Sequence, residues 1–116
     1  MILGIGVDIV DIARFEAALE RTPRLRERVF TEAERPLPVH SLAARFAAKE
    51  AVAKALGAPR GVGHLEAEVR SGDSGKPEVK VTGKAADIAH GLGVKRWHIS
   101  LSHDAGVAVA YVIAEG

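Results

Sequence analysis

The sequence contains no cysteine. That absence excludes disulfides, thiolate metal sites and cysteine nucleophiles, and it fits a reducing compartment. The longest apolar run, residues 105–114, is about half of the roughly 20 residues that a membrane-spanning helix needs. The N-terminus also lacks the basic-then-apolar pattern of a signal peptide. We therefore expect a cytoplasmic protein that does not insert into membranes.

Strong net charge and nucleotide-binding signatures are also lacking. The net charge is only +1 at pH 7, so the total charge gives no general attraction to nucleic acid. There is no Walker A loop, no dinucleotide glycine fingerprint and no zinc-ligand spacing. The chain has 116 residues, of which 47% are hydrophobic and 27% charged, an ordinary composition for a soluble globular domain. We expect residues 1–116 to form a single domain.

The longest predicted helix spans residues 41–56 and is apolar nearly all round. A helix of this kind is usually buried, and buried charges need partners. At about 100° per residue, Arg45 and Lys49 lie together on one side, and Glu50 and Lys54 lie together on another. Alanines flank the second pair, so little side-chain bulk shields it. The pattern predicts a functional site at Glu50 and Lys54.

Residues 2–10 predict a buried strand with two distinct faces. Period-two alternation places Leu3, Ile5, Val7 and Ile9 on one face and Gly4, Gly6, Asp8 and Val10 on the other. Glycine weakens a strand unless something approaches the backbone there, so the two glycines clear the surface beside Asp8. The alternative is that Asp8 is a cap or turn former, but Asp11 is better placed as the N-cap of the next helix.

The next helix, predicted from residue 12 to about residue 20, opens a locally basic stretch. Between residues 12 and 30 there are five arginines against three glutamates. The commoner meaning of such a run is a solvated helix face with ordinary ion pairs. The functional alternative is a docking surface for an acidic protein, because complementary charge steers encounter.

The remaining segments complete an α+β fold. Thr31 and Glu34 have the spacing of a capping box for a very short helix, and Ser41 is placed to cap the long helix. The other expected elements are strands 64–70 and 78–82 as a hairpin, a helix over 83–92, and strands 95–102 and 106–114 as a second hairpin. This order predicts an antiparallel sheet covered by the long helix and shorter helices.

Two constellations carry possible chemistry. Asp8 and Glu50 could share a magnesium ion, which prefers oxygen ligands, and Lys54 would add a positive charge beside a phosphate. On spacing alone, however, Glu50 and Lys54 more often form a simple i,i+4 ion pair. In the run from residue 97 to residue 104, consecutive serine, histidine and aspartate side chains point apart on a strand, which excludes a Ser–His–Asp relay. His103 is either a turn residue or a phosphate contact.

Three motifs together resemble one family. They are Gly-Ile-Gly-Val-Asp-Ile-Val at residues 4–10, Arg-Phe-Ala-Ala-Lys-Glu-Ala at 45–51 and Ile-Ser-Leu-Ser-His-Asp at 99–104. In this order they resemble holo-acyl-carrier-protein synthase, the short bacterial type of 4′-phosphopantetheinyl transferase, over nearly the whole chain. The resemblance implies magnesium-dependent transfer of 4′-phosphopantetheine from coenzyme A to a serine of apo acyl carrier protein, leaving adenosine 3′,5′-bisphosphate. It also implies a homotrimer with the coenzyme held between subunits.

The resemblance assigns roles to individual residues. Asp8 and Glu50 become the magnesium ligands, and the catalytic residues are Glu50, Lys54 and His103. Lys54 lies near the pyrophosphate, and Glu50 is the candidate proton acceptor for the attacking serine. The positions that resemble the coenzyme-binding set are Arg45, Lys54, Gly75, Lys76, Pro77, His103 and Asp104. Those that match the docking helix for the acidic carrier protein and its basic neighbours are Arg14, Arg21 and Arg24.

One segment departs from the family pattern, and two other functions stay open at this point. Residues 31–41 are shorter than usual, with Pro36 and Pro38 where the family has a longer helical stretch. The trimer would explain Arg45 and Lys49 among large apolar residues, because that face would meet a neighbouring subunit or the nucleotide. The alternatives are another magnesium-dependent nucleotide enzyme and a non-catalytic oligomeric binding module.

Overall fold

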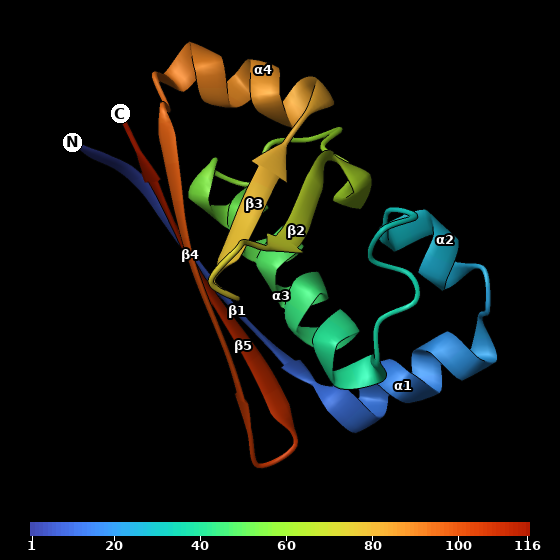
Figure 1. Cartoon of the computed structure of the whole chain (residues 1–116). Helices are drawn as coiled ribbons and strands as arrows, with labels where there is room; N and C mark the ends of the chain where they lie inside the picture. The colour runs from blue at the N-terminus through green and yellow to red at the C-terminus, as the bar shows by residue number, and fades with distance from the viewer.

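A computed structural model describes all residues, 1–116, and shows an α+β fold in which one long helix lies between two antiparallel sheets (Figure 1). The larger sheet has the strand order β1-β5-β4, and the smaller one pairs β2 with β3. The strands are β1 (Ile2–Asp11), β2 (Ala67–Ser71), β3 (Pro77–Val81), β4 (Arg96–Asp104) and β5 (Val107–Glu115). The helices are α1 (Ile12–Arg21), α2 (Leu25–Val29), α3 (Val39–Ala55), α4 (Gly83–Leu92) and the 3-10 turn η1 (His64–Glu66). The predicted fold class is confirmed, and no helix is long and apolar enough to cross a membrane.

The central helix α3 lies unusually close to β1. A Cβ atom built on Gly4 would overlap the carbonyl oxygen of Ala55, and one on Gly6 would overlap that of Ala51. Ala51, like the other alanines at the centre of this contact, is fully buried. The glycines therefore admit the backbone of α3 itself, which brings the end of β1 and the middle of α3 together.

The opposite face of β1 is exposed, which corrects the prediction of a strand buried on both faces. The side chains of Leu3, Ile5, Val7 and Ile9 point to this face, and Ile9 is 63% exposed. We call these four residues the β1 outer face. Alternation in the sequence separates an aliphatic face from the glycine-containing face of Asp8, but it does not indicate what covers each of them. In this chain, no element covers the second face.

The helix boundaries differ from expectation around residues 31–41. Helix α3 begins at Val39, and Ser41 makes no cap, because Pro38 stands at the helix entrance with φ −64° and ψ 158°. The very short helix predicted after Thr31 is a turn. Only half of its capping box forms: Glu34 accepts a hydrogen bond from the Thr31 backbone N–H at 2.9 Å. Helix α2 was not predicted, because its five residues are too few to show a helical period.

The strand predicted over residues 64–70 begins only at Ala67. Residues 64–66 form η1 instead, and Leu65 is 44% exposed where alternation had placed it inward. The cause is Glu66, whose carboxylate accepts hydrogen bonds from the backbone N–H groups of Gly63 (3.0 Å) and Ala85 (2.7 Å). A side chain that bonds neighbouring backbone groups competes with the strand ladder and closes a turn.

Candidate functional site

An open cavity of about 410 Å³ lies where β1, α1 and α3 meet. Two carboxylates distant in the sequence line it together, Asp8 from β1 and Glu50 from α3, and Arg14 of α1 lies beside them. The other lining residues are Ile9, Val10, Asp11, Phe15, Ala18, Leu25 and Phe46. Asp11 is the N-cap of α1 as predicted, and its carboxylate accepts from the Arg14 N–H at 2.9 Å. This cap sets the direction in which α1 leaves the cavity.

Lys54 bonds to β1 rather than to Glu50. Its Nζ atom donates to Asp8 Oδ1 at 3.1 Å and to the carbonyl oxygen of Val7 at 3.0 Å. Glu50 instead contacts His64, with 3.1 Å between Glu50 Oε1 and His64 Nε2. The simple Glu50–Lys54 ion pair that spacing alone favoured is therefore not formed. The lysine side chain is 53% exposed, so its charge remains accessible from the surface.

The donor atoms at this cavity suit a hard divalent cation. Magnesium often takes one or two carboxylates and completes its coordination with water and phosphate oxygens. Asp8 and Glu50 supply two such carboxylates; Asp11 also lines the cavity but caps α1, and no group of three His, Cys, Asp or Glu side chains is placed to hold a metal. An ionised carboxylate has about four acceptor sites, so Asp8 can keep its Lys54 contact and still bind a cation. The residues present fit a magnesium ion that shares its coordination with a substrate phosphate.

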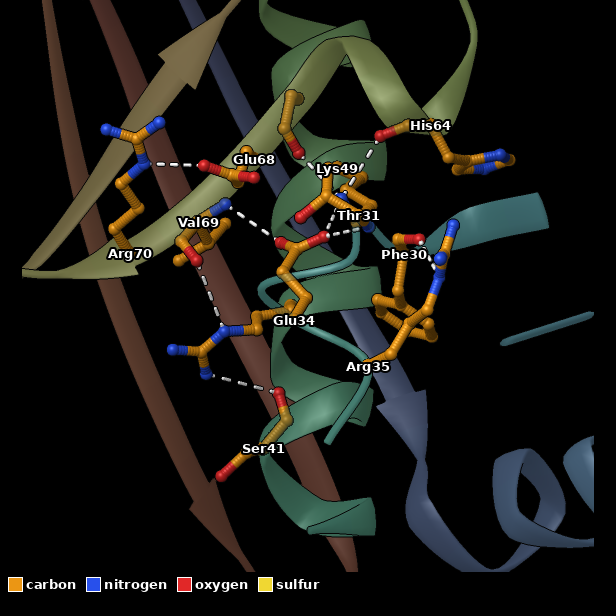
Figure 2. A network of polar contacts seen from close by, with 12 residues as sticks. Phe30, Thr31, Glu34, Arg35, Ser41, Lys49, His64, Glu68, Val69 and Arg70 are labelled. Carbon is orange, nitrogen blue, oxygen red and sulfur yellow. Dashed lines mark hydrogen bonds and ion pairs between the residues drawn. The ribbon is translucent and has the colours of Figure 1, made fainter. Parts of the chain in front are cut away.

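Beside this cavity, α3 carries a buried ion pair between Lys49 and Glu34 (Figure 2). Lys49 Nζ donates to Glu34 Oε1 at 2.8 Å and to the carbonyl oxygens of Ala67 (2.7 Å) and His64 (3.1 Å). The second Glu34 oxygen accepts from the Val69 backbone N–H at 2.9 Å. Burial lowers the pKa of Lys49, and the hydrogen bond and charge of Glu34 oppose that shift.

This pair corrects the prediction that Lys49 meets a neighbouring subunit or a nucleotide. The Lys49 side chain is fully enclosed by its own chain. The sequence did carry a signal, because a lysine on an apolar helix requires a carboxylate partner. The signal did not show that Glu34, expected only as a cap, was that partner. Arg45 lies half-buried nearby, and its guanidinium donates to the carbonyl oxygens of Val69 (3.4 Å) and Ser41 (3.5 Å).

The positions that resemble the family's coenzyme-binding set are spread over the chain. His103 lies at the end of β4, where its ring packs against that of His40 with centroids 5.2 Å apart. The Asp104 carboxylate accepts from the Ala105 backbone N–H at 2.9 Å, as a turn residue does. Gly75 and Lys76 lie in the loop between β2 and β3, and Pro77 begins β3; Lys76 and Pro77 line a separate groove of about 480 Å³. Within one chain, these residues do not join the cavity of Asp8 and Glu50.

The arginines of the predicted docking surface are exposed. Arg14, Arg21 and Arg24 form no ion pair within the chain, so the alternative of a face covered by ordinary ion pairs is not realised. Arg26 behaves differently, because its guanidinium donates to the carbonyl oxygen of Arg35 at 2.7 Å. It therefore ties α2 to the following turn.

Comparisons with known proteins agree over nearly the whole chain. The sequence matches the family model of the 4′-phosphopantetheinyl transferase superfamily over residues 4–112. A curated relative, the holo-acyl-carrier-protein synthase of Streptomyces avermitilis, is 59% identical over 121 residues, which cover 99% of this chain and 98% of the relative. The crystal structure of holo-acyl-carrier-protein synthase from Neisseria meningitidis is similar with a TM-score of 0.90, 35% identity and 100% of both chains covered. The crystal structure of holo-acyl-carrier-protein synthase from Helicobacter pylori, in complex with coenzyme A, is similar with a TM-score of 0.85 and 32% identity. The match covers 96% of this chain and 99% of the Helicobacter pylori chain.

Breaking the buried ion pair should cost far more stability than breaking an exposed one. Lys49→Met leaves the Glu34 carboxylate buried without its cation, so we expect the free energy of unfolding to fall by about 3–5 kcal/mol. Adding Glu34→Gln removes the uncompensated charge and should recover part of that loss. The measurement is denaturant unfolding. The control is Arg70→Met, which breaks the exposed pair with Glu68 and should cost less than about 1 kcal/mol. Equal losses of stability in Lys49→Met and Arg70→Met would contradict the importance of the buried pair.

Proposed function

Because the chain belongs to the 4′-phosphopantetheinyl transferase superfamily, we propose that it transfers 4′-phosphopantetheine from coenzyme A to a serine of apo acyl carrier protein. It is an enzyme, a 4′-phosphopantetheinyl transferase, as its full-length similarity to holo-acyl-carrier-protein synthases shows. The product beside the modified carrier is adenosine 3′,5′-bisphosphate, which remains when phosphopantetheine leaves coenzyme A. We propose that residues 1–116 act as one catalytic domain in the cytoplasm.

The observation that carries this proposal is the meeting of Asp8 and Glu50 at one cavity, with Arg14 on its rim. The two carboxylates hold magnesium, and Arg14 marks the side from which the carrier protein approaches. When bound, the metal supplies neutralisation of pyrophosphate charge, which is most of what phosphoryl transfer requires besides positioning. The carrier serine is thus presented to the coenzyme beside both carboxylates.

Two side chains of this chain take the proton released by the serine and stabilise the charge that develops on the leaving phosphate. The serine oxygen forms a bond to the phosphorus that bears pantetheine, and the phosphorus–oxygen bond to the adenosine bisphosphate breaks. Glu50 accepts the proton of the serine hydroxyl. Lys54, held by Asp8 and the Val7 carbonyl, places its ammonium where the leaving phosphate gains charge. His103 contacts the coenzyme from elsewhere in the assembly.

An assembly is supported by the predicted nucleotide-binding residues that do not line this cavity within one chain, namely Gly75, Lys76, Pro77, His103 and Asp104. The β1 outer face offers a surface for it: four aliphatic side chains in a row, with exposed fractions of 38–63%. Contiguous exposed apolar surface of this kind marks interaction sites. We propose a homotrimer in which the loop at Gly75, Lys76 and Pro77, together with Arg45, His103 and Asp104, binds the nucleotide end of coenzyme A between subunits.

Replacing either carboxylate should impair activity, each in a different way. We expect Glu50→Gln to lower the rate of carrier modification by about 10²–10⁴-fold, because the proton acceptor is lost. Asp8→Asn should raise the magnesium concentration needed for activity. The measurement is mass spectrometry of apo acyl carrier protein incubated with coenzyme A and magnesium. Full activity of both variants would show that Asp8 and Glu50 are not the magnesium ligands. A carrier protein left unmodified by the wild-type chain would contradict the proposed phosphopantetheine transfer.

Reversing the charge of Arg14 should weaken carrier-protein use and spare coenzyme binding. We expect Arg14→Glu to raise the KM for the carrier roughly tenfold at low salt, with a smaller effect at high salt. The matched control is Lys80→Glu, an exposed cation on β3 that should leave both KM values unchanged. Equal loss of coenzyme and carrier binding in Arg14→Glu would argue against a docking role. The alternative function, a magnesium-dependent nucleotide enzyme that uses no carrier protein, predicts no selective effect of Arg14→Glu on the KM for the carrier.

Charge placed on the β1 outer face should dissociate the assembly. The double variant Ile5→Asp and Ile9→Asp changes two side chains that are exposed in the single chain, so it should fold and sediment as a monomer. The wild type should sediment with the mass of three chains. The control, Leu92→Asp on α4, alters a similarly exposed residue outside this face and should remain trimeric. A monomeric wild type would overturn the proposed assembly without affecting the chemical assignment.

A further inference from the structure

We propose that His64 is a positioning residue for Glu50: its ring holds the Glu50 carboxylate in the orientation that binds the divalent cation. This inference rests on the proposed function. None of the motifs that carry the family resemblance contains His64, and its spacing from Glu50 gave no signal in the sequence. The assignment comes from the contact itself and from the way the fold fixes the imidazole.

The contact leaves one oxygen of Glu50 free. Glu50 Oε1 lies 3.1 Å from His64 Nε2, and Oε2 makes no hydrogen bond within the protein. An ionised carboxylate is only an acceptor, so Nε2 is the nitrogen that carries the proton in this bond. One oxygen is therefore held by the imidazole, and the other remains available to a cation.

His64 approaches Glu50 from a different side than Asp8 does. A second cavity of about 230 Å³, which His64 lines with Pro59 and Val62, also reaches Glu50 but not Asp8. Glu50 is the one residue that lines both this cavity and the larger one. The imidazole therefore contacts the Glu50 carboxylate from outside the cavity that Asp8 and Glu50 share, since His64 is not among the residues that line it.

One contact holds the imidazole, and two others hold the backbone that carries it. Its ring stacks on Phe46, with centroids 5.4 Å apart and planes 23° apart. The backbone carbonyl oxygen of His64 accepts from the buried Lys49 ammonium at 3.1 Å, a bond that Figure 2 shows next to the Glu34 network. The turn that carries it is closed by Glu66, and the hydrogen bonds from Gly63 and Ala85 keep the pKa of Glu66 below its usual value.

These contacts distinguish His64 from an ordinary surface partner. A half-exposed pair such as this one, with side chains 39% and 38% exposed, contributes little to folding stability. A ring that stacks on Phe46, on a backbone held by Lys49, nevertheless restricts the rotamers of Glu50, so less side-chain entropy is lost when a cation binds. Hydrogen-bond partners of metal-ligating carboxylates typically change metal affinity 10–100-fold. The effect of His64 should therefore appear in metal binding and not in stability.

The test is Mn²⁺ binding to the full chain in the presence of coenzyme A, measured from the electron paramagnetic resonance signal of free Mn²⁺. Mn²⁺ is the probe because it takes the same oxygen ligands as magnesium. His64→Phe keeps a ring to stack on Phe46 but has no N–H, and we expect the Mn²⁺ dissociation constant to rise about 10–100-fold. His64→Gln restores an N–H donor and should recover most of the affinity. Both variants should melt at the wild-type temperature, and kcat at saturating metal should be close to that of the wild type.

The possible outcomes separate this inference from the proposed function. If the wild type binds Mn²⁺ and His64→Phe binds it equally well, the positioning role is wrong and the metal site stands. If His64→Phe and His64→Gln lose affinity and melting temperature together, His64 is only a structural residue and the inference fails. If the wild type binds no more Mn²⁺ than Glu50→Gln does, the proposed metal site itself fails, and the inference fails with it.

Discussion

The buried ion pair between Glu34 and Lys49 is the interaction on which the other parts of the site depend. Removing two charges from water is costly, and it is tolerated only where further hydrogen bonds satisfy both groups. Here the four segments that meet at the pair provide those bonds: the turn after α2, helix α3, the turn η1 and strand β2. The pair therefore joins four segments at one point, in addition to the apolar packing of α3 on β2 and on the end of α2.

The other side of α3 is fixed by close approach rather than by charge. Gly4 and Gly6 let the helix backbone lie directly on β1, so Asp8 and Glu50 come from two elements that cannot separate without losing that contact. Lys49 and Glu50 are consecutive residues that point to different sides of the helix. The same turn of helix thus anchors the core with one side chain and presents a carboxylate to the cavity with the next.

Local patterns predicted most of the fold, and long-range contacts account for the rest. Helices α1 and α4, the N-cap at Asp11 and both hairpins follow from periodicity and turn chemistry within a few residues. Asp8 and Glu50 were singled out because glycines and an apolar helix made their charges unusual. The partners of Lys49 and Glu50, which lie 15 and 14 residues away, left no local pattern to detect. The sequence predicted that β1 is buried, but its outer face is exposed. A local apolar pattern does not show which other segment, if any, covers that face.

If the chain forms the proposed homotrimer, the β1 outer face also matters before the subunits associate. Strand β1 is an edge strand, paired only with β5, so its apolar side chains adjoin a row of unpaired backbone groups. An apolar edge is a template for strand addition by any other chain, including a misfolded copy. Correct association and aggregation therefore compete for the same few residues. In the proposed assembly, the balance between them would depend on how soon a newly folded chain meets its partner subunits, and the apparent stability of the protein would depend on its concentration.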